Sequence, residues 1–190
     1  IITLILGIAF FIRAKNQIKK DLSKRKEEFN KPRVVVIGGG TGQSIFLRGL
    51  KKITPNITAV VTVADNGRST GKLRDELNIP AVGDISKVLL SMANADPEII
   101  ELMEYRFGAN TELETHSIKN LMLAALLEQK GDFKHAIPVL EKMLNIKGSV
   151  LPITEENVSL VGITQDNTEI VGEDEITKVS DKIKAIKYDK

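Results

Sequence analysis

The chain has 190 residues, enough for one domain of ordinary size, and no cysteine, which excludes a disulfide framework, a thiolate metal site and a cysteine nucleophile. Its net charge of +2 is unevenly placed, because residues 1–33 hold nine Lys or Arg against three Asp or Glu and the rest of the chain is net acidic. Nucleic-acid binding needs clustered positive charge, so the acidic body argues against nucleic acid as a partner.

An apolar run, residues 1–12, opens the sequence, and a basic segment, residues 13–32, follows it. The run is shorter than the ~20 apolar residues that span a bilayer. Apolar residues followed by basic ones are typical of the cytoplasmic flank of a membrane segment, whereas a signal peptide has the opposite order. An amphipathic surface helix is the alternative, although the run has no polar face. We therefore expect a truncated membrane anchor, a basic linker and a cytoplasmic body tethered to the inner face of the cell membrane.

A strand, a glycine-rich turn and a helix follow one another from residue 34. Residues 34–37 are β-branched and predict a short strand buried on both faces. The helical pattern comes after the glycine stretch, which we define as residues 38–42 and which consists of Gly38, Gly39, Gly40, Thr41 and Gly42. Free amides and a helix N-terminus at one point favour an anion such as a nucleotide phosphate. A tight turn without a ligand is the alternative, because the spacing is neither a strict G-x-G-x-x-G nor a P-loop.

A second polar loop follows the next predicted strand, residues 57–63. Asp65 lies near the ~20-residue spacing at which an acidic residue meets a ribose in dinucleotide-binding folds. Two such loops, at the carboxyl ends of neighbouring strands, could hold an extended and doubly charged ligand. Arg68 could pair with a phosphate or remain solvated. The loop itself reads Asn66, Gly67, Arg68, Ser69, Thr70 and Gly71.

The rest of the chain is helical in pattern and then returns to strands. Residues 84–147 are helical, with Asp84 as the predicted N-cap of a helix over residues 85–93. Later, residues 158–163 and 169–171 flank a turn and predict a β-hairpin. Strands separated by helices predict an α/β protein.

Three ordered blocks resemble the YvcK/CofD family, and more closely its YvcK-type branch, the gluconeogenesis factors. They are VIGGGTG at residues 36–42, TVADNGRSTG at 62–71, and GDI at 83–85 with HSIKN at 116–120. The resemblance implies a Rossmann-like, doubly wound and mostly parallel sheet, of which residues 33–190 are the N-terminal part of a nucleotide-binding domain. The family's second half contributes to the same sheet, so we expect an incomplete sheet with an unpaired edge in this chain.

The resemblance implies a regulatory protein that binds a nucleotide sugar of the UDP-N-acetylglucosamine kind. Nucleotide phosphates often require Mg²⁺, which is therefore an optional ion at the site. Such a protein supports cell shape and wall growth on gluconeogenic carbon, and an unidentified protein partner would read its ligand-bound state. The CofD branch implies an enzymatic alternative, a 2-phospho-L-lactate transferase acting on a nucleotide-linked substrate. The position of Asp65 leaves a third hypothesis, an NAD-dependent oxidoreductase.

The resemblance also assigns binding residues, and it assigns no catalytic or metal residue. Through it, the glycine stretch would hold the diphosphate, Asp65 and Asn66 would face the sugar or ribose, and His116 and Asn120 would line the same crevice. Ser69 and Asp84 complete the candidates, and Asp84 is alternatively a helix cap or an outer ligand of Mg²⁺. Against the family pattern, Asn66 replaces a carboxylate. The other departures are Arg68, Thr115 and Lys119 at glycine positions and Lys87 at a position usually held by Asn.

Overall fold

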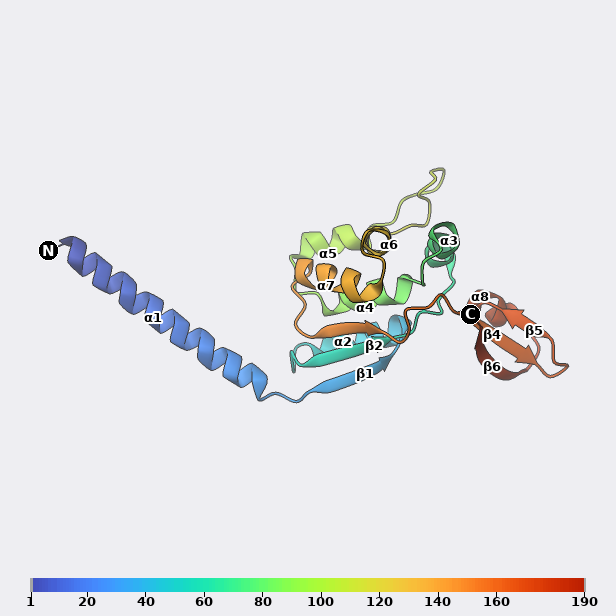
Figure 1. Ribbon diagram of the computed structural model, residues 1–190, viewed down its shortest axis with the longest axis horizontal. Helices are drawn as coiled ribbons and strands as arrows, with labels where there is room; N and C mark the ends of the chain where they lie inside the picture. Colours follow the sequence, from blue (N-terminus) through green and yellow to red (C-terminus); the bar gives the residue numbers. More distant parts are fainter. Residues whose placement is uncertain (1, 190) are drawn as a thin grey trace.

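The computed structural model describes residues 2–189 and, among these, all side chains except those of residues 2–9, 25, 28, 29 and 68. Helix α1, Ile2–Phe29, is a single helix that reaches away from the rest of the molecule (Figure 1). The helix runs without a break from the apolar run into the basic segment and ends at Phe29. Residue 1 lies outside the described residues. In the described chain, no helix is both long and apolar enough to cross a membrane. Tethering to a membrane therefore stays a prediction.

A three-stranded parallel sheet forms the base of the main body. Its strands are β1 (Val34–Gly38), β2 (Ile57–Val61) and β3 (Ser149–Pro152), in the order β1-β2-β3. The β-branched and aliphatic residues of these strands suit a pleated surface that packs on a core. The predicted α/β class is confirmed, and all three carboxyl ends lie at one edge of the sheet.

Helices cover one face of this sheet (Figure 1). The aliphatic core lies between the sheet and the helices, where Ala59, Leu47, Ile85, Leu123 and Leu140 are almost fully buried. The helices are α2 (Gly40–Leu50), α3 (Arg68–Leu77), α4 (Gly83–Met92), α5 (Pro97–Glu104), α6 (Ile118–Lys130) and α7 (Phe133–Met143).

The opposite face of β1 is open, so the prediction of a strand buried on both faces is wrong. Val35 and Ile37 are 63% and 73% exposed, whereas Val34 and Val36 point to the helices together with their partners on β2. The physical reason is the position of β1, which is an edge strand with helices on only one side. Leu151 of β3 shares the open face and is 49% exposed.

A second, antiparallel sheet lies at the end of the molecule opposite α1 (Figure 1). The predicted hairpin is confirmed, because β4 (Ser159–Thr164) pairs with β5 (Glu169–Val171). Strand β6 (Ile183–Asp189) adds on the other side of β4, and helix α8 (Glu173–Lys178) packs on this sheet. A Cβ on Gly162 would lie 3.0 Å from Ile176, so the glycine lets α8 approach closely. This packing brings the start of α8 next to the main body.

The predicted cap of α4 is wrong. Val82 is the N-cap, and Asp84 lies inside the first turn of the helix, because the helix begins at Gly83. Its carboxylate is directed to the glycine stretch instead of to its own helix, as described below.

Gly148 lies in the connection between α7 and β3, where a substitution can test the backbone conformation. Its φ is +113°, and a Cβ there would lie 2.5 Å from the carbonyl oxygen of Ile57. We expect Gly148→Ala to lower the free energy of unfolding by about 1–3 kcal/mol from backbone strain alone. Gly49→Ala, in α2 with nothing within 4 Å of the new Cβ, is the control and should stabilise by about 0.5–1 kcal/mol. Urea unfolding of both variants measures this, and equal stability would contradict the account.

Candidate functional site

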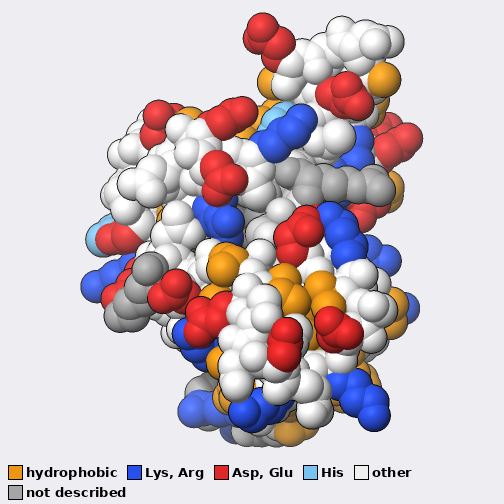
Figure 2. Space-filling model, turned by 90° about the vertical axis from the view of Figure 1, so that its right-hand side faces the viewer, with side chains coloured by type: hydrophobic (Ala, Val, Ile, Leu, Met, Phe, Trp, Pro, Cys, Tyr) orange, Lys and Arg blue, Asp and Glu red, His pale blue; other side chains and the backbone are white. Residues whose placement is uncertain are grey.

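A pocket of about 320 Å³ opens where the loop after β2 meets the starts of α4, α6 and α8. We call it the charged pocket. On the end of the molecule where the second sheet lies, acidic and basic side chains stand side by side (Figure 2). The pocket is lined by Asp65, Gly67, Ser69, Thr70, Gly83, Lys87, Arg106, Lys119, Asn120 and Asp174.

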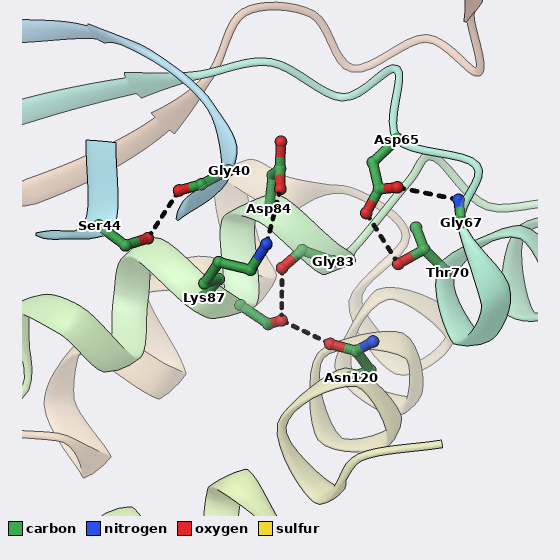
Figure 3. Close-up of polar contacts among 10 residues, drawn as sticks. Gly40, Ser44, Asp65, Gly67, Thr70, Gly83, Asp84, Lys87 and Asn120 are labelled. Carbon is green, nitrogen blue, oxygen red and sulfur yellow. Dashed lines mark hydrogen bonds and ion pairs between the residues drawn. The ribbon is translucent and has the colours of Figure 1, made fainter. Parts of the chain in front are cut away.

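Asp65 folds the loop after β2 back on itself. One carboxylate oxygen accepts from the Gly67 amide at 2.9 Å, and the other accepts from the Thr70 hydroxyl at 3.1 Å (Figure 3). Gly83 presses against this pair, since a Cβ there would lie 2.1 Å from Thr70 Oγ1. Hydrogen bonds to a carboxylate fix its position while leaving lone pairs free to accept from a ligand. Asp65 is therefore both the brace of the loop and a wall of the pocket.

A buried chain of polar contacts joins the loop, α4 and α6. Asn120 Oδ1 accepts from the Ser86 hydroxyl at 2.6 Å (Figure 3). Asn120 Nδ2 donates to Ser69 Oγ at 3.1 Å. Ser69 Oγ in turn lies 3.0 Å from His116 Nδ1. Because Asn120 already donates to the Ser69 oxygen, the hydroxyl hydrogen of Ser69 is free to donate to the imidazole. The predicted residues Ser69 and Asn120 thus line the pocket, and His116 supports Ser69 from behind.

Burial lowers the pKa of His116, and Lys72 lowers it further while Glu76 opposes the change. The neutral ring is therefore the form that fits the folded protein. The neutral ring is also the form whose Nδ1 can accept a hydrogen bond from the Ser69 hydroxyl.

Asp84 lies against the glycine stretch. The Gly40 amide hydrogen-bonds to its carboxylate, and a Cβ on Gly39 would lie 2.8 Å from Asp84 Oδ2. Lys87 Nζ is 3.4 Å from Asp84 Oδ1 (Figure 3). Burial and the neighbouring Asp65 raise the pKa of Asp84 in spite of Lys87. The anion position at the start of α2 is therefore already occupied by a side chain of the chain itself.

Asn66 ties the loop to the second sheet. Its Oδ1 accepts from the Asp174 amide at 3.2 Å, and a Cβ on Gly172 would lie 2.2 Å from its Nδ2. Gly172 also has φ +100°, a conformation that favours glycine. Asn66 therefore holds α8 beside the pocket, and Asp174 becomes a lining residue. Burial raises the pKa of the adjacent Glu173, and Asp65 and Asp84 raise it further.

Three cations of the pocket were not among the predicted site residues: Lys87, Arg106 and Lys119. Two of them had a signal in the sequence, since Lys87 and Lys119 depart from the family pattern. The residues of the glycine stretch are not among the lining residues, although Asp84 links them to the pocket. The side chain of Arg68 lies outside the described residues. Among the described residues, no group of three or more His, Asp and Glu is arranged to hold a metal ion.

The sequence comparison places the chain in a family. Residues 34–190 match the model of the family described as 2-phospho-L-lactate transferase CofD. The chain belongs to this family. It is similar to the gluconeogenesis factor of Halalkalibacterium halodurans, with 44% identity over 156 residues that cover 82% of this chain and 48% of the relative. The gluconeogenesis factor of Bacillus subtilis is 43% identical over 156 residues, 82% of this chain and 49% of the relative.

A solved structure agrees with the fold. The crystal structure of a UPF0052-family protein from Bacillus halodurans matches with a TM-score of 0.79 and 42% identity, over 83% of this chain and 51% of that one. The predicted resemblance to the YvcK/CofD family is confirmed. The chain spans about half the length of the curated relatives it matches. The activity of the whole protein is therefore treated below as a proposal.

The buried His116 predicts a pH dependence of stability. Its pKa in the folded chain lies below the ordinary value of 6.5, so at a pH between the two the unfolded chain binds the proton and the folded chain does not. The stabilisation that comes from keeping His116 neutral is complete above pH 6.5, and it is lost as the pH falls toward the pKa of the folded chain. We expect the free energy of unfolding to decrease on acidification below pH 6.5, and His116→Gln to flatten that decrease. His135→Gln, at an exposed histidine, is the control and should retain it in urea titrations across the pH range.

Proposed function

We propose that the chain binds a nucleotide sugar of the UDP-N-acetylglucosamine kind in the charged pocket and acts as a regulator. The main support for the proposal is that carboxylates, an amide and three cations line the same pocket. Asp65, Asp174 and Asn120 suit the hydroxyl groups of a sugar or ribose, and the cations suit a phosphate. Membership of the CofD family, whose relatives include gluconeogenesis factors, supports a role in growth on gluconeogenic carbon.

The regulatory part of the proposal rests on how the pocket is built. Its walls come from the loop after β2, from α4, α6 and α8, and a ligand that touched several of them would favour one arrangement. A protein partner would then distinguish the bound from the free state. In the cell, we propose that this supports cell shape and wall growth on gluconeogenic carbon. The exposed Phe10, Phe11 and Ile12 on α1 favour the proposed membrane tether.

One contact favours the transferase alternative. Ser69 Oγ and His116 Nδ1 are 3.0 Å apart, the distance of a nucleophile and its base. Against an enzyme, Ser69 Oγ also accepts a hydrogen bond from Asn120, which lowers its nucleophilicity. Mass spectrometry of the ligand and of the chain after incubation separates the two functions. An unchanged nucleotide sugar favours the regulator, whereas turnover or a covalent adduct on Ser69 favours the transferase.

Calorimetric titration tests the proposed ligand directly. We expect UDP-N-acetylglucosamine to bind the 190-residue chain at micromolar concentration, and Asp65→Asn to weaken binding about tenfold through loss of a charged acceptor. Asp75→Asn, which removes an exposed carboxylate from α3, is the matched control and should bind like the original chain.

UDP-glucose, GDP and NAD, each with and without Mg²⁺, are the competing ligands in the same titration. Binding of NAD alone would favour the oxidoreductase hypothesis. Binding of none of the nucleotides would contradict the proposed function.

A further inference from the structure

Asp84 makes the start of α2 a poor place for a phosphate. Its carboxylate already accepts from the Gly40 amide, and its oxygens approach both Gly39 and Gly40. A phosphate on the same amides would lie next to this negative charge and would have to displace it. The glycine stretch is therefore closed by the chain itself, and another group must receive the ligand's negative charge.

Lys119 is the most buried of the three cations that line the charged pocket. It is only 9% exposed and lines the charged pocket from the first turn of α6. In the part of the chain that the structure describes, no carboxylate lies within ion-pair distance of it. Its attractive neighbour is Glu104, whose carboxylate is paired with Arg48 at 3.6 Å.

Three effects disfavour the positive charge of the Lys119 ammonium group. Burial lowers the pKa of Lys119, and Arg106 and Lys87 lower it further. In addition, a cation in the first turn of a helix opposes the helix dipole, which favours negative charge at that end. A bound anion would relieve all three at once.

Arg106 and Lys87 complete a set that we call the cationic wall, formed by Lys87, Arg106 and Lys119. Arg106 is held in place through Nη1, which donates to the carbonyl oxygen of Thr115 at 2.7 Å. A guanidinium and two ammonium groups around one pocket suit a phosphate group. The carboxylates of Asp65 and Asp174 belong to the same pocket, so its charges are mixed and a phosphorylated sugar fits better than a bare polyanion.

We infer that the cationic wall, and not the glycine stretch, is the subsite for the ligand's phosphate, with Lys119 as the residue that gives this chain its preference for phosphorylated ligands. The inference deepens the proposed function and rests on it for the identity of the nucleotide sugar. The phosphate subsite itself can be tested without the sugar.

The test uses calorimetry and thermal unfolding of the 190-residue chain with two probes, pyrophosphate and UDP-N-acetylglucosamine. Lys119→Met removes the charge at similar length, and Lys119→Arg restores it. We expect Lys119→Met to weaken binding of both probes about tenfold and Lys119→Arg to recover most of it. We also expect Lys119→Met to raise the melting temperature of the ligand-free chain, because the buried cation is costly. A purely structural lysine would lower it.

Lys130→Met, at the exposed C-terminal end of the same helix, is the control and should bind both probes like the original chain. If UDP-N-acetylglucosamine binds and Lys119→Met leaves its affinity unchanged, the phosphate subsite is wrong and the proposed function stands. If only pyrophosphate binds, and does so through Lys119, the subsite stands and the proposed nucleotide sugar is wrong. Binding of neither probe overturns both.

Discussion

The side-chain amide of Asn120 holds the site together. Through its oxygen it contacts Ser86 on α4, and through its nitrogen it contacts Ser69 at the start of α3, so one buried group fixes three segments. A buried amide is costly unless its donors and acceptors are paired, and the pairing here is specific in direction. The segments can therefore meet in one arrangement, and that arrangement forms the charged pocket.

The pocket keeps opposite charges close without neutralising them. The carboxylate of Asp65 is braced by the Gly67 amide and the Thr70 hydroxyl, while Lys119, a largely buried cation, lines the same pocket. Such an arrangement costs stability in the absence of a ligand, because charged groups are removed from water without full compensation. Sites that bind polar ligands commonly accept this cost, and the second sheet adds to it by placing Glu173 and Asp174 nearby.

Much of the fold could be predicted because its signals are local. The β-branched run before the glycine stretch and the hairpin around residues 165–167 are defined by neighbouring residues, and both form as expected. The exposure of Val35 and Ile37 could not be predicted, since it depends on which strands and helices surround β1. Helix α8 was missed because it is short and almost wholly polar, and it is held by a contact between Asn66 and the distant Asp174.

In the site, too, some features follow from local sequence signals and others depend on how the helices pack. Asp65, Ser69 and Asn120 were predicted from ordered blocks and do line one pocket. The role of Asp84 depends on α2 and α4 packing together, which places its carboxylate against Gly40 instead of on its own helix end. Lys119 could not be identified as a pocket residue from the sequence alone, because a lysine in a helix is ordinarily solvated. Its burial accompanies the packing of α6 against α3, α4, α5 and α7, which local sequence signals do not reveal.

We propose that the ligand occupies the charged pocket and leaves the glycine stretch free. The most direct measurement is an NMR titration of the backbone amides with UDP-N-acetylglucosamine. We expect the largest shifts on residues 67–70 and on Lys119 and Asn120. Shifts confined to the glycine stretch, residues 38–42, would contradict it.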